Sequence, residues 1–380
     1  AGLFQLPMVA EYGWGRDTFG LAIAIQNLLW GLGSPFAGAI ADRYGARAVL
    51  CVGALLYAAG LVAMAYASTP GMLHLTAGVL VGFGLSAASF NLVIGAFGKL
   101  LPEGWRPLAF GAGTAAGSFG QFFYPPIGNA LIASVGWHDA LLVFAGSVLL
   151  IMPLATLLAG RPVPDRLPAG TTAPAPRQSI AQALGEAFRH PSYNLLVLGF
   201  FTCGFQLAFI TVHLPAYLKD AGVSASIGAW TLAVIGLANA VGSLTAGWLS
   251  TRMSRRVLLA WIYLGRAVAI AAFVLVPPTP LTCILFGISM GLLWLSTVPP
   301  TSSLVMLMFG TRYMAMLYGF AFFSHQVGGF LGVWLGGLMY ERYGNYDLVW
   351  WLSVALGLAS AVINLPIREQ PVVRPAVAAA

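Results

Sequence analysis

Residues 33–50 read GSPFAGAIADRYGARAVL, and residues 242–259 read GSLTAGWLSTRMSRRVLL. Laid over one another without gaps, the two stretches share glycine, serine, alanine, arginine and leucine at matching places. The match recurs further along the chain, at an offset of 208–209 residues, with Gly120 over Gly328 and Asp139 over Asp347. The chain is therefore expected to contain two copies of one unit in the same order and orientation.

The composition indicates what kind of unit is repeated. The chain has 380 residues, of which 59% are hydrophobic and 8% charged, with a mean hydropathy of +0.85. Soluble domains carry about 25% charged residues, so the expected fold class is an all-α polytopic membrane protein. The three cysteines show neither a disulfide framework nor zinc-ligand spacing. The histidines and acids do not cluster, so we expect no metal and no cofactor.

Apolar runs of about 20 residues, the length that crosses a bilayer, recur along the whole chain. Residues 1–10 are expected to be the outer end of a further span, truncated at its start. The expected organisation is a six-helix bundle over 1–160, a linker over 161–190, and a six-helix bundle with a short tail over 191–380. The eleven full spans are expected at 18–40, 48–67, 72–97, 108–134, 138–160, 193–217, 227–249, 257–276, 281–308, 316–339 and 348–366.

The basic residues predict the orientation, because lysine and arginine concentrate in cytoplasmic loops. Of the 18 basic residues, fourteen fall at one end of the spans, Arg16, Lys219 and Arg342 fall at the other, and Arg266 falls inside a span. We therefore expect both termini in the cytoplasm and a bacterial inner (plasma) membrane location. The net charge of +7 then reflects topology, and no nucleic-acid partner is expected.

The segment between the two bundles has two parts. Residues 161–179 are too rich in proline for a helix. In residues 180–190 apolar side chains recur four apart, which favours a short amphipathic helix on the cytoplasmic interface. An ordinary ordered end of the linker is the alternative.

Two six-helix halves in parallel orientation are typical of secondary transporters, which bind substrate between the halves and alternate access by rocking. We therefore expect rocker-switch transport and no enzyme activity. The run Ala116–Gly120 approaches the G-x-S-x-G nucleophile pattern. It lacks the first glycine, lies in a helix and has no carboxylate nearby, which argues against an intramembrane hydrolase.

Residues 38–47, GAIADRYGAR, resemble the loop signature between helices 2 and 3 of the major facilitator superfamily. The resemblance covers essentially the whole chain and implies the fold of that superfamily. Its acid and arginines are expected to form a cytoplasmic charge latch, although a cluster that only sets topology is the alternative. The second copy has Thr251 in place of the acid. The expected gating residues are Gly38, Asp42, Arg43, Gly45 and Arg47.

Residues 106–118, RPLAFGAGTAAGS, resemble the helix-5 motif of the monocarboxylate porters. This resemblance implies transport of small organic anions, often with a proton. Relatives carry an acid or asparagine on helix 8 and an arginine four residues later, whereas this chain has Asn239 and Ser243. Residues 124–129, YPPIGN, match the helix-5 signature of drug/proton antiporters only in part.

Arg266 is the only charged residue expected at membrane depth, because the other basic residues and all eleven acids map to loops. An arginine there costs at least about 2.5–3.5 kcal/mol and needs a partner. It is expected either to hold a substrate carboxylate, as a guanidinium can through two parallel hydrogen bonds, or to cap carbonyls freed by Pro299 and Pro300. The sequence favours neither.

Polar residues inside the spans are candidates to line a substrate site. His325 could also take the coupling proton, because its unperturbed pKa is about 6.5, and a neutral histidine bonded between helices is the alternative. The other candidate substrate-binding residues, besides Arg266 and Asn239, are Gln121, Tyr124, Ser118, His325, Gln326, Asn91, Trp294 and Thr297.

Together these features predict a monomeric transporter of a small organic anion, a mono- or dicarboxylate, with proton symport favoured over antiport. The missing membrane carboxylate disfavours export of cations, which generally requires a buried acid. Export of a neutral or amphiphilic compound is the main alternative. A non-transporting membrane sensor of the same fold is a weaker one.

Overall fold

The computed structural model describes residues 4–158 and 178–372, and within these ranges the chain is helical without strands. Nine helices of the described part are long and apolar enough to cross a membrane. Large apolar side chains such as Phe36, Trp230 and Trp261 are exposed on their outer surfaces. An all-α, polytopic membrane fold is therefore confirmed.

The first set of helices runs from residue 4 to residue 158. The span at residues 70–100 is divided, because Ser89 adopts an extended conformation (φ −80°, ψ 157°) between two helical pieces. Gly136, with a φ of 84°, lies between two arms of one long helix, at a conformation that glycine adopts without steric cost. The elements are α1 (Gln5–Tyr12), α2 (Arg16–Tyr44), α3 (Ala46–Ala65), α4 (Pro70–Leu73), η2 (His74–Leu80), α5 (Val81–Ala88), α6 (Phe90–Leu100), η3 (Glu103–Trp105), α7 (Arg106–Val148), α8 (Ile151–Ala155) and η4 (Thr156–Leu158).

The second set runs from residue 178 to residue 372. Its fourth membrane span is interrupted at residues 294–297, just before two prolines that lack a backbone N–H. The elements are α9 (Ile180–Arg189), α10 (Pro191–Asp220), α11 (Ala225–Leu249), α12 (Arg255–Leu275), α13 (Pro280–Leu293), α14 (Val298–Phe309), α15 (Met314–Tyr343) and α16 (Asp347–Asn364).

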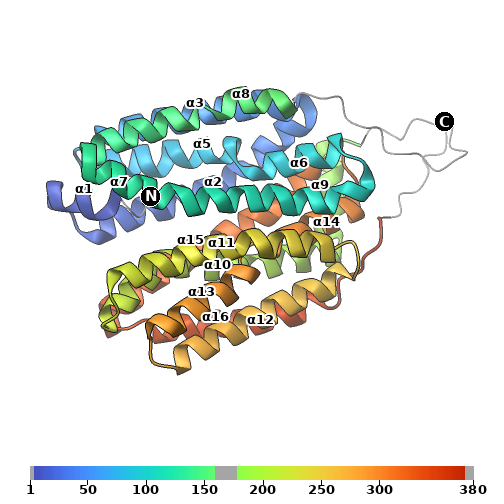
Figure 1. Cartoon of the computed structure of the whole chain (residues 1–380). Coiled ribbons are helices and arrows are strands. Elements are labelled where there is room, and N and C mark those ends of the chain that lie inside the picture. Colours follow the sequence, from blue (N-terminus) through green and yellow to red (C-terminus); the bar gives the residue numbers. More distant parts are fainter. Residues whose placement is uncertain (1–3, 159–177, 373–380) are drawn as a thin grey trace, which may run out of the picture.

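The two sets lie side by side as two groups of long, roughly parallel helices (Figure 1). They meet along two seams, α2 against α15 and α7 against α11. A Cβ on Gly38 would lie 2.5 Å from the carbonyl oxygen of Ala315, and one on Gly111 would lie 2.7 Å from that of Ser243. Further along α2 and α15, a Cβ on Gly20 or Gly337 would meet nothing within 4 Å. The backbones of both seams therefore touch at the end of the bundle that carries Gly38 and Gly111, which we call the linker end.

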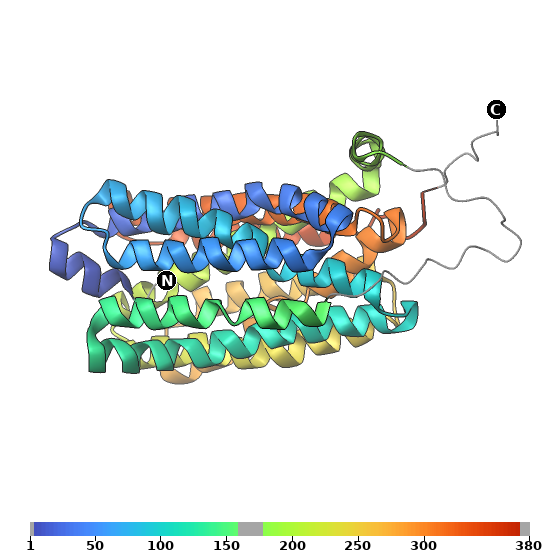
Figure 2. The same ribbon diagram turned by 90° about the horizontal axis from the view of Figure 1, so that it is seen from above.

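Helix α9 lies at the linker end, outside the main bundle (Figure 2). Ser179 and Gln182 form a capping box that starts the helix. Ala183 and Ala187 are buried, and Leu184 packs against the core of the second helix set. The predicted amphipathic helix is present, and its apolar face contacts the protein rather than remaining free for lipid. Residues 159–177 of the predicted linker lie outside the described residues.

Candidate functional site

Arg266 lies in the middle of α12 and is fully buried. Its Nε donates to the carbonyl oxygen of Leu293 at 2.9 Å, and its Nη2 donates to the same oxygen at 2.6 Å and to that of Trp294. These carbonyls belong to the interruption between α13 and α14, where the helix cannot satisfy them. Arg266 therefore caps free backbone carbonyls, as in one of the two roles expected for it. These carbonyls belong to Leu293 and Trp294, which precede the proline pair.

One donor group of Arg266 has no acceptor. Within the described part of the chain, Nη1 is buried and has no hydrogen-bond partner. Because Nε and Nη2 both face carbonyls, only Nη1 is available to a ligand in this arrangement. A carboxylate would therefore meet Arg266 through one nitrogen and not through a two-pronged contact.

Asn239 connects α11 to two other elements. Its Nδ2 donates to Ser118 Oγ on α7 at 2.7 Å, and its Oδ1 accepts from the backbone N–H of Leu295 at 2.9 Å. Asn239 and Ser118 are fully buried. The structure thus brings together two predicted site residues across a seam, next to the carbonyls that Arg266 binds.

His325 and Gln326 form a second connection across the seam between α15 and α2. Nδ1 of His325 lies 2.8 Å from Oε1 of Gln326, and Nε2 of Gln326 donates to Oδ1 of Asn27 at 3.2 Å. Because an amide oxygen only accepts, Nδ1 carries the proton in this pair. Asn27 was not predicted, although an asparagine inside the apolar run 18–40 is the kind of signal that singled out Asn239.

Cys203 on α10 is a second residue that sequence reasoning did not assign to the site. Its Sγ lies 3.4 Å from Oγ1 of Thr297 and 3.9 Å from the carbonyl oxygen of Trp294, the same oxygen that Arg266 contacts. His325 is also its neighbour. In the sequence this cysteine is an isolated residue in an apolar run, and only the tertiary fold brings it to the arginine.

The remaining candidates lie in different environments. Trp294 is buried and contributes its carbonyl oxygen, while Asn91 is buried with neither amide atom partnered in the described part of the chain. Gln121 is exposed. Tyr124 is about half exposed, and its hydroxyl donates to Ser147 Oγ at 3.2 Å within the same helix set, away from Arg266.

Asp42 near the end of α2 forms the polar contact that closes the linker end. Its carboxylate accepts from the backbone N–H of Met316 at 2.8 Å and lies 2.6 Å from Nζ of Lys99. The amide of Ala315 is a longer third donor, at 3.4 Å. Asp42 thus binds the amino end of α15, where unpaired N–H groups and the helix dipole favour a negative charge.

The other predicted gating residues differ in their contacts. Gly38 allows the backbones of α2 and α15 to touch, and Gly45 has a φ of 95°, which suits a turn. Arg43 and Arg47 are exposed, with Arg43 over the ring of Tyr44. The basic partner of Asp42 is therefore Lys99, and the two arginines lie outside this contact.

The loop of the second helix set that corresponds to residues 38–47 binds a carboxylate from a different part of the chain. Glu369, in the tail after α16, accepts from Ser254 Oγ at 2.6 Å and from the backbone N–H of Arg256 at 2.9 Å. The side chain of Arg255 is a further donor to it, at 3.4 Å. This carboxylate caps the start of α12 within its own helix set, whereas Asp42 reaches into the other set.

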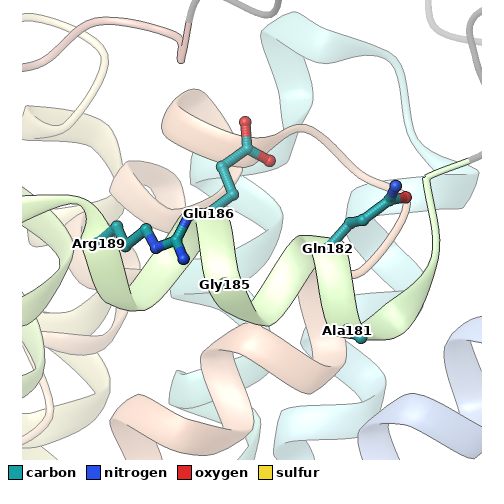
Figure 3. A pocket seen from close by; sticks show the side chains of 5 residues that line it. All are labelled: Ala181, Gln182, Gly185, Glu186 and Arg189. Atoms are coloured by element: carbon teal, nitrogen blue, oxygen red, sulfur yellow. The ribbon is translucent and has the colours of Figure 1, made fainter.

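A surface hollow of about 490 Å³ lies on α9. Figure 3 shows that it is formed by one helix, with the side chains of Gln182, Glu186 and Arg189 around it. It lies on the linker helix, on a different element from Arg266, Asn239 and Cys203. We therefore place the candidate site at the seams between the two helix sets and not at this hollow.

Comparison with known proteins agrees with this architecture. Residues 1–333 match the family model of the Major Facilitator Superfamily. An uncharacterized MFS-type transporter of Bacillus subtilis, YcxA, is 28% identical over 372 residues, covering 95% of this chain and 88% of that protein. Human monocarboxylate transporter 11 is 28% identical over 365 residues, covering 91% of this chain and 73% of that protein.

Solved structures show the same fold. The proton:xylose symporter XylE superposes with a TM-score of 0.72 at 16% identity, covering 96% of this chain and 90% of that one. The fucose:proton symporter FucP of E. coli superposes with a TM-score of 0.66 at 18% identity, covering 95% of this chain and 93% of that one.

Two helix sets that meet along two seams, with buried polar side chains between them, are the architecture of a membrane transporter. The chain belongs to the Major Facilitator Superfamily. It is an integral, multi-pass membrane protein whose relatives move small molecules across the bilayer and are not enzymes.

Proposed function

We propose that this protein is a secondary active transporter of a small organic anion, a mono- or dicarboxylate. The observation that carries the proposal is the unpartnered, fully buried Nη1 of Arg266. A guanidinium at membrane depth demands an anion or an acceptor, and the carboxylates of the described part lie at helix ends, in loops, just after the Gly136 break of α7 or on the linker helix α9. Relatives named monocarboxylate transporters support the same class of substrate.

The substrate would bind between the two helix sets, with its carboxylate near Arg266. Asn239 is the first polar neighbour, because it reaches both Ser118 and the interruption that holds Trp294 and Thr297. His325 and Gln326 would line the opposite side, beside α2. Asn91, Gln121 and Tyr124 remain proposed substrate contacts, at a different stage of the transport cycle.

Transport would proceed by rocking of the two helix sets, in symport with a proton. His325 is the proposed proton acceptor. The contact of Asp42 with Met316 would break when the linker end opens, and Gly38 would separate from Ala315. We place the linker end in the cytoplasm of a bacterium, with both termini on that side of the inner membrane and the protein as a monomer.

Thermal stability of the purified full-length protein tests this proposal. Acetate, lactate, pyruvate, oxalate and succinate would be compared with hydrophobic cations and neutral amphiphiles, at low and neutral pH. A ligand raises the free energy of unfolding by RT ln(1 + [L]/Kd). We expect one class of carboxylate to stabilise the protein, more strongly at low pH.

Arg266→Lys and Arg252→Gln separate the site from general charge effects. Arg252 is exposed, over the ring of Trp248, so its replacement should leave carboxylate binding unchanged. Arg266→Lys keeps the charge but moves the donor, and should weaken binding about tenfold or more. Stabilisation by amphiphiles with no response to any carboxylate would favour the exporter and contradict the proposal.

A further inference from the structure

We propose that the interruption at Ser89 is a second anion site, where the amino end of α6, Ser89 and Asn91 together bind a carboxylate. We call it the α6 site. It belongs to the first helix set, whereas Arg266 belongs to the second. The carboxylate as ligand rests on the proposed function, while the unpartnered polar groups belong to the ligand-free protein.

The amino end of α6 is not capped by its own N-cap residue. Ser89 holds that position in an extended conformation, and its side chain makes no capping hydrogen bond. The first N–H groups of a helix have no partner within the helix, and the helix dipole makes this end positive. An anion bound at the start of this 11-residue helix would therefore be stabilised.

Two buried side chains at this end also lack partners. Oγ of Ser89 and both amide atoms of Asn91 have no hydrogen-bond partner in the described part of the chain. Ser89 is 4% exposed and Asn91 is 2% exposed. Asn91 is the second residue of α6, and a helical side chain leans back toward the amino end of its helix. Asn91 therefore points toward the end that Ser89 leaves uncapped.

The α6 site faces the seam between the two helix sets. Gly95 lies one turn after Asn91 on the same face of α6, and its Cβ would lie 2.6 Å from that of Ala315 on α15. The ring of Phe90 contacts that of Phe322, also on α15, with centroids 5.9 Å apart. Asn91 lies between these two contacts along the helix, so it turns toward the other helix set.

Trp30 on α2 adds a donor beside the same aromatic ring. Its ring lies 5.0 Å from that of Phe322, and its Nε1 is buried with no partner among the residues that the structure describes. An indole N–H only donates. Phe322 also stacks on His325, with centroids 5.3 Å apart. The α6 site is therefore separated by one ring from the proposed proton acceptor.

The second helix set indicates what kind of ligand is needed. Its corresponding interruption ends at Thr297, and there Oδ1 of Asn239 accepts from the backbone N–H of Leu295. At the repeat offset of 209 residues, Trp30 stands where the second set has Asn239. An indole has no oxygen, so the first set lacks the acceptor that Asn239 provides in the second. A carboxylate, which only accepts, would supply it.

Thermal unfolding of the ligand-free, full-length protein tests the α6 site without any substrate. Asn91→Leu replaces unbonded polar atoms by an apolar side chain of similar size, so we expect the midpoint of unfolding to rise. Asn364→Leu is the matched control, because it removes the bond from Nδ2 to the carbonyl oxygen of Ser360 and should lower the midpoint. A lower midpoint in Asn91→Leu would show that its amide is already bonded and would overturn the proposal.

Binding is followed by NMR of the indole N–H groups, in which the Trp30 resonance is assigned by its loss in Trp30→Phe. The probes are sodium acetate and sodium succinate, with sodium chloride at equal ionic strength as the blank. We expect a saturable shift of the Trp30 resonance, and an affinity about tenfold weaker or more in Asn91→Leu. Asn364→Leu should respond as the parent protein does. No response to either carboxylate, or an unchanged response in Asn91→Leu, would contradict the α6 site.

Arg266→Lys separates the two sources of the carboxylate. If one dicarboxylate spans both sites, this variant should also weaken the response of Trp30 to succinate. If two separate anions bind, the response of Trp30 to acetate should remain unchanged. Either result supports the α6 site.

The same variant distinguishes failure of this inference from failure of the proposed function. If carboxylates stabilise the protein through Arg266 but the Trp30 resonance does not move, the proposed function stands and the α6 site is wrong. If Trp30 responds while Arg266→Lys changes neither this response nor the thermal stabilisation, the α6 site stands and the proposed role of Arg266 falls.

Discussion

The carboxylate of Asp42 accepts a hydrogen bond from the backbone N–H of Met316, 274 positions further along the chain, at 2.8 Å. This contact joins the end of α2 to the start of α15, across the seam between the two helix sets. The side chain of Asp42 is almost completely buried there, with Lys99 as its ion-pair partner. A buried carboxylate held by two backbone amides and a lysine is a contact that must break for the linker end to open.

Asp42→Asn should shift the protein toward a conformation that is open at the linker end. The amide keeps the shape but loses the charge that the amino end of α15 and Lys99 stabilise, a loss of about 1–3 kcal/mol. Spin labels on α2 and α15 near the linker end should report a larger population of long distances. Asp139→Asn, at an exposed position at the opposite end, is the control and should leave the distances unchanged.

Gly38→Ala should disturb closure of the same seam by steric means. Its Cβ would lie 2.5 Å from the oxygen of Ala315, so the two backbones must separate. We expect a loss of about 1–3 kcal/mol in the free energy of the closed state, seen as faster thiol labelling of a cysteine placed at the linker end. Gly20→Ala on the same helix has open space, and equal labelling in both variants would contradict the steric role of Gly38.

Asn239→Leu should destabilise the protein and impair transport together. It removes the bonds to Ser118 and to the N–H of Leu295, leaving the latter buried and unpaired at a cost of about 1–3 kcal/mol. A thermal unfolding scan should show the lower stability. Thr245→Ala on the same helix removes only an exposed bond to Val241 and should change the stability little. Similar losses in the two variants would show that Asn239 has no special role.

His325→Asn should slow uptake driven by a pH gradient by about tenfold or more, because a positioned imidazole no longer carries the proton. Exchange of labelled for unlabelled substrate, which moves no net proton, should persist in reconstituted liposomes. His138→Asn, at an exposed position beside Asp139, serves as the control. Undiminished gradient-driven uptake in His325→Asn would exclude His325 from the proton route.

The fold could be predicted from the sequence because each bilayer-spanning helix needs an apolar run, which hydropathy displays directly. The contacts of Arg266 with carbonyls near a proline pair could also be anticipated, since a buried guanidinium and freed carbonyls need one another. The face that each helix turns toward the other set could not be predicted. Spans of this protein are apolar on all sides, so Asn27 and Cys203 carry no sign of which neighbour they meet.

The position of α9 shows the same limit. The sequence of α9 is compatible with a helix lying on the lipid interface and with an ordered end of the linker. In the structure its apolar face packs against the second helix set. Lipid and a protein core are both apolar environments, so the periodicity of Ile180, Leu184 and Phe188 is compatible with either. The choice depends on the surface offered by α10 and α15, which no local pattern reveals.

The carboxylates of Asp42 and Glu369 differ in which helix set they bind. Asp42 crosses to the other helix set, whereas Glu369 stays within its own. At the linker end, α7 and α11 meet at Gly111 and Gly247, where backbone touches backbone. Separating α2 from α15 would remove the donors of a buried carboxylate, whereas α7 and α11 touch at this end through the backbones of Gly111 and Gly247. Opening of the linker end would therefore depend on breaking the contacts of Asp42, which lie at the α2–α15 seam and not at the α7–α11 seam.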